Sequence, residues 1–241
     1  MRLLITRPQP DADKLAAELA ARGHTCIISP VLEILPHDAE VVFDGVQALL
    51  LTSRNGVRAL CTATDRRDIP VLAVGRGTAN EAEGAGFKTL AASGDVAALG
   101  ALVRETLRPD AGTLLWITGK NVRGDLRADL RAAGYSVVRH VLYEARPVGA
   151  LPEPGAAALQ RQEIDGALFF SPRTAQSFVR ILTMAGLESA TRSVTAFCLS
   201  PAVAAALAGA PWGAIEVAAQ TDRAALLDLV DQKDAMTRNA Q

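Results

Sequence analysis

Six short segments of the chain combine small hydroxyl residues, glycine and arginine in a way that suits the binding of an anion. They are Thr6-Arg7-Pro8, Thr52-Ser53-Arg54-Asn55, Gly75-Arg76-Gly77-Thr78, Thr118-Gly119-Lys120-Asn121, Ser171-Pro172-Arg173-Thr174 and Ser200-Pro201. Each segment follows a short apolar run and precedes a helical pattern. A helix N-terminus offers unpaired backbone N–H groups and the positive end of the helix dipole. These segments therefore favour a ligand that carries several negative charges.

Helix capping is an alternative explanation. Ser, Thr and Asn are good N-caps, and proline is common in the first helical turn. Capping does not explain the arginines that recur one or two positions into a segment, namely Arg7, Arg54, Arg76 and Arg173. A guanidinium fits carboxylates and phosphates. A high GC content of the coding sequence would explain the excess of Arg over Lys equally well.

Named catalytic motifs are incomplete in this chain. Gly75-Arg76-Gly77 begins like a dinucleotide-binding fingerprint, but Asn80 stands at the third glycine position. Gly119-Lys120-Asn121 lacks the upstream glycine and the following Ser or Thr of a phosphate-binding P-loop. No nucleophile elbow, carboxylate pair or Cys/His cluster is present. The pattern favours either an anion-binding protein or an enzyme that works by positioning its substrate.

Charge and cysteine content exclude several classes of protein. The formal net charge is -1, whereas nucleic-acid binders are usually basic. No apolar run reaches the ~18 residues of a membrane span, and Arg and Pro interrupt the N-terminus too early for a signal peptide. Cys26, Cys61 and Cys198 are typical of free thiols in a reducing compartment. The histidines have no metal-ligand spacing. We expect a cytoplasmic protein that uses no metal and binds neither nucleic acid nor membrane.

The elements that would position these segments alternate between strands and helices. The expected strands are Leu3–Thr6, Thr25–Ile28, Ala48–Thr52, Val71–Val74, Thr89–Ala91, Leu114–Thr118, Val137–Val141, Ala167–Phe170, Thr195–Leu199 and Ile215–Ala218. The helical runs include Asp11–Arg22, Val96–Leu107, Arg123–Ala133, Thr174–Ala185, Ala202–Ala208 and Arg223–Asp231. This alternation predicts an α/β fold with parallel sheets. The length suits two sheets of about five strands each.

An internal repeat supports two similar sheets. Leu4-Ile5-Thr6 and its helix recur as Trp116-Ile117-Thr118 and its helix, about half a chain later. Further pairs in the same order are Leu49–Arg54 with Leu168–Arg173, Ala73–Gly75 with Phe197–Leu199, and Ser93–Leu99 with Gln220–Leu226. Proline-bearing connectors near residues 30–37 and 143–154 leave two arrangements open. The domains are either simple tandem domains, or a middle domain and a second domain made by joining the two ends.

Taken in order, these motifs resemble uroporphyrinogen-III synthase. The resemblance rests on Leu4–Pro8, Leu50–Val57, Ala73–Ala79, Phe170–Arg173 and the connector that contains Tyr143. It implies two flavodoxin-like (Rossmann-like) parallel-sheet domains, of which the first is discontinuous. The first would comprise residues 1–34 with 147–241 and the second residues 39–141, joined by extended hinge connectors at 35–38 and 142–146. It also implies a monomeric lyase without a cofactor.

The implied activity is the cyclisation of hydroxymethylbilane, a linear tetrapyrrole, to uroporphyrinogen III. Water is lost and the last ring is inverted through a spiro intermediate. The substrate would lie in a cleft between the domains, after transient handover from hydroxymethylbilane synthase. The neutral phenol of Tyr143 would be the catalytic hydrogen-bond donor. The residues expected to bind substrate are Arg7, Thr52, Ser53, Arg54, Gly75, Arg76, Thr78, Gly119, Arg123, Ser171, Arg173 and Ser200.

The six segments are the corners between an expected strand and the helix that follows it. One corner departs from the family pattern, and other functions stay open. Ala202 stands in the corner where the family has a threonine, which leaves Ser200 as the nearest hydroxyl. This departure favours a non-catalytic, two-lobed sensor of an anionic ligand on the same fold. A nucleotide- or flavin-dependent α/β enzyme is a further alternative, but the incomplete fingerprints count against it. On position alone, Tyr143 could also be a packing residue.

Overall fold

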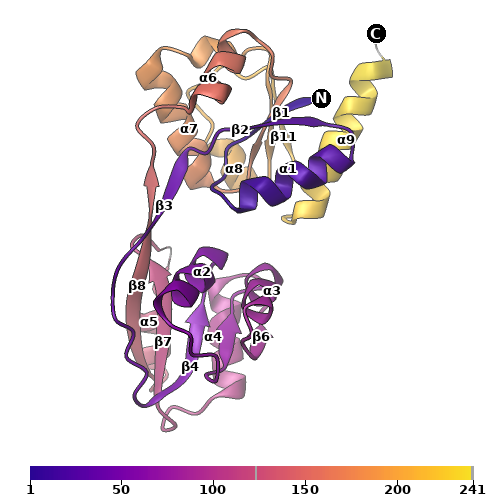
Figure 1. Ribbon diagram of the computed structural model, residues 1–241. Coiled ribbons are helices and arrows are strands. Elements are labelled where there is room, and N and C mark those ends of the chain that lie inside the picture. Colours follow the sequence, from indigo (N-terminus) through magenta and orange to yellow (C-terminus); the bar gives the residue numbers. More distant parts are fainter. Residues whose placement is uncertain (123, 240–241) are drawn as a thin grey trace. The chain divides into compact units, whose positions relative to one another are not determined.

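Short apolar runs form the strands of two sheets in the computed structural model, which describes residues 1–122 and 124–239. The chain divides into unit 1, made of Met1–Glu33 and Arg146–Gln241, and unit 2, made of Ile34–Ala145. In unit 1 the indigo N-terminal strands share a sheet with strands from the second half of the chain (Figure 1). The first domain is therefore discontinuous, and the simple tandem arrangement is wrong.

Unit 1 contains a five-stranded sheet with the order β11-β10-β9-β1-β2, and its pairings are parallel. Within the unit this is the order 2-1-3-4-5 of flavodoxin-like folds. Its strands are β1 (Arg2–Ile5), β2 (Thr25–Ile28), β9 (Gly166–Phe169), β10 (Thr195–Cys198) and β11 (Ala214–Val217). Its helices are α1 (Asp11–Ala21), α6 (Glu153–Gln160), α7 (Pro172–Ala185), the 3-10 helix η1 (Glu188–Thr191), α8 (Pro201–Ala205) and α9 (Arg223–Asn239).

Unit 2 contains a six-stranded sheet with the order β3-β8-β7-β4-β5-β6. Its strands are β3 (Leu32–Pro36), β4 (Val46–Leu51), β5 (Val71–Ala73), β6 (Thr89–Ala91), β7 (Thr113–Gly119) and β8 (Ser136–Pro147). Its helices are α2 (Arg54–Ala63), α3 (Arg76–Gly84), α4 (Val96–Thr106) and α5 (Leu126–Ala132). The pairings among β4, β5, β6, β7 and β8 are parallel.

The two sheets share one spatial order. It is β2-β1-β9-β10-β11 in unit 1 and β8-β7-β4-β5-β6 in unit 2, where β3 is added beyond β8. Strands in equal places carry the segments that repeat in the sequence, such as β1 with β7 and β9 with β4. Each sheet thus combines strands from both copies of the repeat. The strand order reverses between β1 and β9 in one sheet and between β7 and β4 in the other. Parallel α/β sheets bind ligands at such switch points.

Two strands differ from the expectation. Strand β3 was not expected and gives the second sheet six strands in place of five. Strand β8 was expected to end at Val141 but continues to Pro147, which places Tyr143 inside a strand. The reason is that β8 has a second hydrogen-bonded neighbour, β3, which was not expected from the sequence. The domain limits and the hinge role expected for residues 35–38 and 142–146 stay a prediction.

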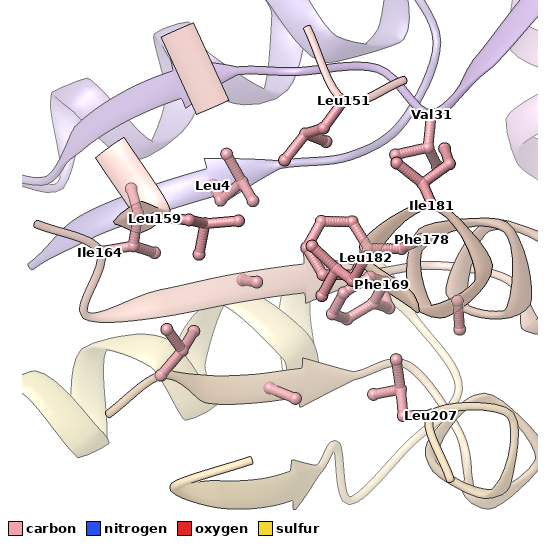
Figure 2. Packing of buried hydrophobic residues seen from close by; sticks show 14 of the residues in the cluster. Leu4, Val31, Leu151, Leu159, Ile164, Phe169, Phe178, Ile181, Leu182 and Leu207 are labelled. Carbon is pink, nitrogen blue, oxygen red and sulfur yellow. The ribbon is translucent and has the colours of Figure 1, made fainter. Parts of the chain in front are cut away.

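Among the residues that the structure describes, the core consists of four clusters of buried side chains, two in each unit. Leu4 of β1 belongs to a cluster that otherwise comes mostly from residues after 150 (Figure 2). Within it, Phe169 of β9 packs edge-on against Phe178 of α7, with ring centroids 5.3 Å apart. Burial of one such side chain contributes about 1.5–3 kcal/mol. The first strand is therefore held by packing against the second half of the chain.

Gly166, at the start of β9, leaves no room for a side chain. An added Cβ would lie 2.5 Å from Cε2 of Phe197 and 3.1 Å from Cδ2 of Leu3. We expect Gly166→Ala to lower the free energy of unfolding by about 1–3 kcal/mol, the usual cost of overpacking. Urea denaturation followed by circular dichroism measures this change.

The matched control is Gly84→Ala at the end of α3, where an added Cβ would meet nothing within 4 Å. Alanine there should leave stability unchanged or raise it by up to about 1 kcal/mol. Equal midpoints for the two variants would show that Gly166 is not tightly packed.

Candidate active site

The expected corner residues lie at one edge of each sheet, because the carboxyl ends of parallel strands meet at the same edge. In unit 2, Ser53 follows β4 and Gly119 ends β7, and these two strands flank the switch point. In unit 1, Arg7 follows β1 and Ser171 follows β9, which flank the other switch point. The sequence therefore placed these residues correctly relative to the strands.

Ser53 makes two side-chain contacts. Its Oγ accepts a hydrogen bond from the backbone N–H of Gly56 at 3.0 Å and so caps helix α2. The same Oγ lies 2.8 Å from the phenol oxygen of Tyr143. A hydroxyl has one donor and two acceptor positions, so the cap leaves Ser53 able to donate to Tyr143 or to accept from it. The capping explanation is correct for Ser53, but it does not account for the contact with Tyr143.

Tyr143 reaches this place because the pairing of β7 with β8 is irregular. Thr118 pairs with Val141, but the next residue, Gly119, pairs with Tyr143. Leu142 is therefore an extra residue, and its side chain is buried in the core. A bulge of one residue changes which side chains of a strand face which partners. Without the bulge at Leu142, regular pairing would place Leu142, and not Tyr143, opposite Gly119.

Gly119 allows the ring of Tyr143 to lie directly against the backbone of β7. A Cβ added to Gly119 would lie 2.8 Å from both Cε2 and Cζ of Tyr143 and 3.1 Å from its phenol oxygen. The backbone N–H of Lys120 also donates to the carbonyl of Tyr143 at 2.8 Å. Ser53, Gly119 and Tyr143 thus come together from three separate strands or corners, at the switch point of unit 2.

In the corner after β5, the side chain of Arg76 is exposed to solvent and that of Thr78 is buried. The Arg76 side chain is 73% exposed, and a carboxylate oxygen of Glu83 lies 4.0 Å away from it. Thr78 is 7% exposed, so its side chain lies mostly within the unit. A Cβ on Gly75 would lie 3.1 Å from the Cα of Gly94, so glycine lets this corner approach the chain that follows β6.

In unit 1, the carboxylate of Asp11 already compensates the positive charge of Arg7. Arg7 is 12% exposed and its Nη2 donates to Oδ2 of Asp11 at 2.9 Å. Its guanidinium also lies over the ring of Phe170, 4.5 Å from the centroid. Ser171 caps α7, as expected from its position. Ser200 begins α8 but makes no side-chain cap.

The remaining expected residues are half-buried or lie outside the described part of the chain. Thr52, Arg54 and Arg173 are of intermediate exposure at their corners. Arg123 lies outside the described residues. Arg139, in contrast, was not expected from the sequence. It donates to the hydroxyl of Thr118 and to backbone carbonyls at the end of β7. Its only signal in the sequence is that Arg139, with its neighbour His140, interrupts the apolar run of the expected strand Val137–Val141.

Burial shifts the pKa of the three thiols and of His140. Burial raises the pKa of Cys198 to about 12 and that of Cys26 to about 11. Burial is also the main cause that raises the pKa of Cys61. Since the thiolate is the nucleophile, these thiols are poorly reactive. Burial lowers the pKa of His140, which favours its neutral form.

Residues 1–122 and 124–239 contain neither a cluster of metal ligands nor a helix that could span a membrane. Across this part of the chain, His, Cys, Asp and Glu side chains nowhere gather in a group of three or more that could hold a metal ion. None of the helices described has the length and apolar character needed to cross a bilayer. The expectation of an enzyme without a cofactor stays a prediction.

Comparison with known proteins decides the family. A family model described as Uroporphyrinogen-III synthase HemD matches residues 13–228. The chain belongs to the uroporphyrinogen-III synthase family. Members of this family are hydro-lyases of tetrapyrrole biosynthesis. The resemblance inferred from the corner motifs is thus confirmed. No curated protein sequence matches the chain.

Solved structures of the same family share the fold. Uroporphyrinogen-III synthetase from Helicobacter pylori 26695 aligns with a TM-score of 0.65 at 17% identity, over 95% of this chain and 98% of that chain. A mutant uroporphyrinogen III synthase from the extremely thermophilic bacterium Thermus thermophilus aligns with a TM-score of 0.58 at 21% identity, over 99% of both chains. These likenesses confirm an α/β fold with two parallel-sheet domains.

Gly119→Ala tests the contact between Gly119 and Tyr143. The new methyl group must push the ring of Tyr143 away, because 2.8 Å is shorter than a carbon–carbon contact allows. The bond to Ser53 should then lengthen or break. Tyrosine labelled with ¹³C at Cζ reports this by NMR as a changed Tyr143 resonance.

The chain offers an internal control, since it has 2 tyrosines. Tyr135 donates its phenol proton to the carbonyl of Leu107 at 2.9 Å, whereas the three atoms nearest to a Cβ on Gly119 all belong to Tyr143. Its resonance should stay in place. A Tyr143 resonance identical to that of the unmodified protein would disprove the close contact.

Proposed function

We propose that this chain cyclises hydroxymethylbilane to uroporphyrinogen III and that Tyr143 assists the departure of water. The observation that carries the proposal is the phenol of Tyr143, held 2.8 Å from Ser53 at the switch point of unit 2. Support also comes from membership of the uroporphyrinogen-III synthase family. We further propose that the protein is a cytoplasmic monomer that receives its substrate transiently from hydroxymethylbilane synthase.

The proposed reaction balances without an oxidant or reductant. The C–O bond of the terminal hydroxymethyl group breaks, and the oxygen takes up one proton and leaves as water. The substituted carbon of the last pyrrole attacks the resulting azafulvene and forms a spiro intermediate. This intermediate fragments and recloses with the ring inverted, and the carbon that forms the new bond loses one proton. The protein's task is to hold one near-attack arrangement and to exclude water from the azafulvene.

Ser53 is proposed to support the phenol as a donor. The backbone N–H of Gly56 donates to Ser53 Oγ, which leaves the serine proton available for the phenol oxygen. When the phenol oxygen accepts this bond, its own proton can be donated to the departing hydroxyl. Hydrogen bonds in such a chain strengthen one another. An unperturbed phenol carries its proton at neutral pH and can donate it directly, whereas a carboxylate would first have to take up a proton.

The corner residues are proposed to hold the acetate and propionate carboxylates of the substrate. Arg76 is the best-placed arginine for this role, because it is largely exposed and the carboxylate of Glu83 lies as far as 4.0 Å away. Arg7 is less suited, because Asp11 and the ring of Phe170 already surround its guanidinium. Further members of the proposed binding set are Thr52, Ser53, Arg54, Gly75, Thr78, Gly119, Arg123, Ser171, Arg173 and Ser200.

The decisive assay supplies freshly made hydroxymethylbilane to protein that has been treated with a chelator and dialysed exhaustively. Type I and type III products are then separated by chromatography. Closure without the enzyme gives the type I isomer, so we expect the protein to produce mainly type III. Saturable binding with only type I product would instead favour the non-catalytic sensor. Activity that returns only after a metal is added would contradict the cofactor-free mechanism.

Tyr143→Phe removes the phenol oxygen and keeps the ring against Gly119. We expect kcat to fall by at least about tenfold, since general-acid assistance typically contributes about 10²–10⁴-fold. KM should change little, because the lost interaction acts on the departing hydroxyl. Tm should stay within about 2–4 °C, and the residual product should still be type III. A normal kcat in Tyr143→Phe would reduce this residue to a packing role.

A further inference from the structure

Arg139 makes a set of hydrogen bonds that no other described side chain makes at the end of β7. Its Nε donates to Oγ1 of Thr118 at 3.1 Å. Its Nη2 donates to the carbonyl of Gly119 at 3.0 Å and to the carbonyl of Lys120 at 2.7 Å. The guanidinium also lies near the face of Trp116, 6.0 Å from the ring centroid. One side chain of β8 thus contacts three consecutive residues of β7 and the corner after it.

This contact lies where the pairing of β7 with β8 becomes irregular. The pairing of β7 with β8 is regular from Thr113 to Thr118 and shifts by one residue at Gly119. Past that shift, the backbone N–H of Lys120 donates to the carbonyl of Tyr143 at 2.8 Å. Arg139 occupies the carbonyls of Gly119 and Lys120, and so fixes the orientation of two successive peptide groups. The position of the Gly119 backbone, against which the ring of Tyr143 lies, depends on these peptide groups.

We propose that Arg139 is a positioning residue that sets the place of the Tyr143 phenol by holding the end of β7. The part of this proposal that concerns turnover rests on the proposed function. Arginine suits the role because its planar fork presents several donors in fixed directions. A lysine carries a similar charge but offers a single nitrogen, which cannot reach three separate acceptors in the same way. Arg139 itself need not touch the substrate.

Arg139→Met removes the donors and keeps an unbranched side chain against Trp116. With tyrosine labelled at Cζ, we expect the Tyr143 resonance to shift or split and the Tyr135 resonance to stay in place. In the cyclisation assay, kcat should fall by about tenfold while KM changes by less than about twofold. Arg139→Lys should resemble Arg139→Met in both measurements, because charge without the fork does not hold two carbonyls. It also serves as the second variant if Arg139→Met does not fold.

Arg131→Met is the matched control, since Arg131 of α5 likewise donates from its guanidinium to the backbone, but to the carbonyl of Val137 in β8, at 3.2 Å. We expect it to leave the Tyr143 resonance unchanged. An unchanged Tyr143 resonance in both Arg139 variants would overturn the positioning role, whatever the turnover. The positioning role by the guanidinium would also be overturned if the Tyr143 resonance moved in Arg139→Met but kept its wild-type position in Arg139→Lys. A positive charge at this position would then be enough to hold the end of β7. If the resonance moves but kcat does not, the positioning role stands and the proposed catalytic role of Tyr143 fails.

Discussion

The contact between the ring of Tyr143 and the backbone of Gly119 is the constraint on which the candidate site depends. It requires a glycine at the end of β7, because any Cβ there would overlap the ring. It also requires the extra residue Leu142 in β8, because regular pairing would place a leucine opposite Gly119. Given both, the phenol lies at the distance of a hydrogen bond from Ser53. A bulge next to a functional site is a recurring device for aiming one side chain.

The two sheets have the same strand order, but their switch points carry different chemistry. The switch point of unit 2 carries two hydroxyls, those of Ser53 and Tyr143. The equivalent place in unit 1 carries Arg7, which is paired with Asp11 and lies over Phe170. The same strand order therefore presents a pair of hydroxyls in one unit and a charge-compensated cation in the other.

Helix capping and function are not alternatives at Ser53. One Oγ satisfies the first turn of α2 and still contacts the phenol, because a hydroxyl has three hydrogen-bonding positions. Capping also makes the position of Ser53 precise, since it fixes the serine to the start of a helix whose core face is buried. Ser171 shows capping of the same kind without an aromatic hydroxyl partner. The residue type is thus shared by both units, and its surroundings decide what it does.

The sequence by itself determined the α/β class, the strands other than β3 and the last part of β8, the internal repeat and the family. These follow from local patterns, namely apolar runs, helix caps and ordered motifs, which are present in the chain before it folds. It also placed the expected residues at the carboxyl ends of strands. Only the tertiary structure decided that β3 joins the second sheet, that Leu142 bulges and that Arg139 holds the end of β7. These features depend on pairing between strands far apart in sequence, where a shift of one residue changes which side chains meet. Local sequence patterns do not determine that register, so the contact between Ser53 and Tyr143 could not be derived from them.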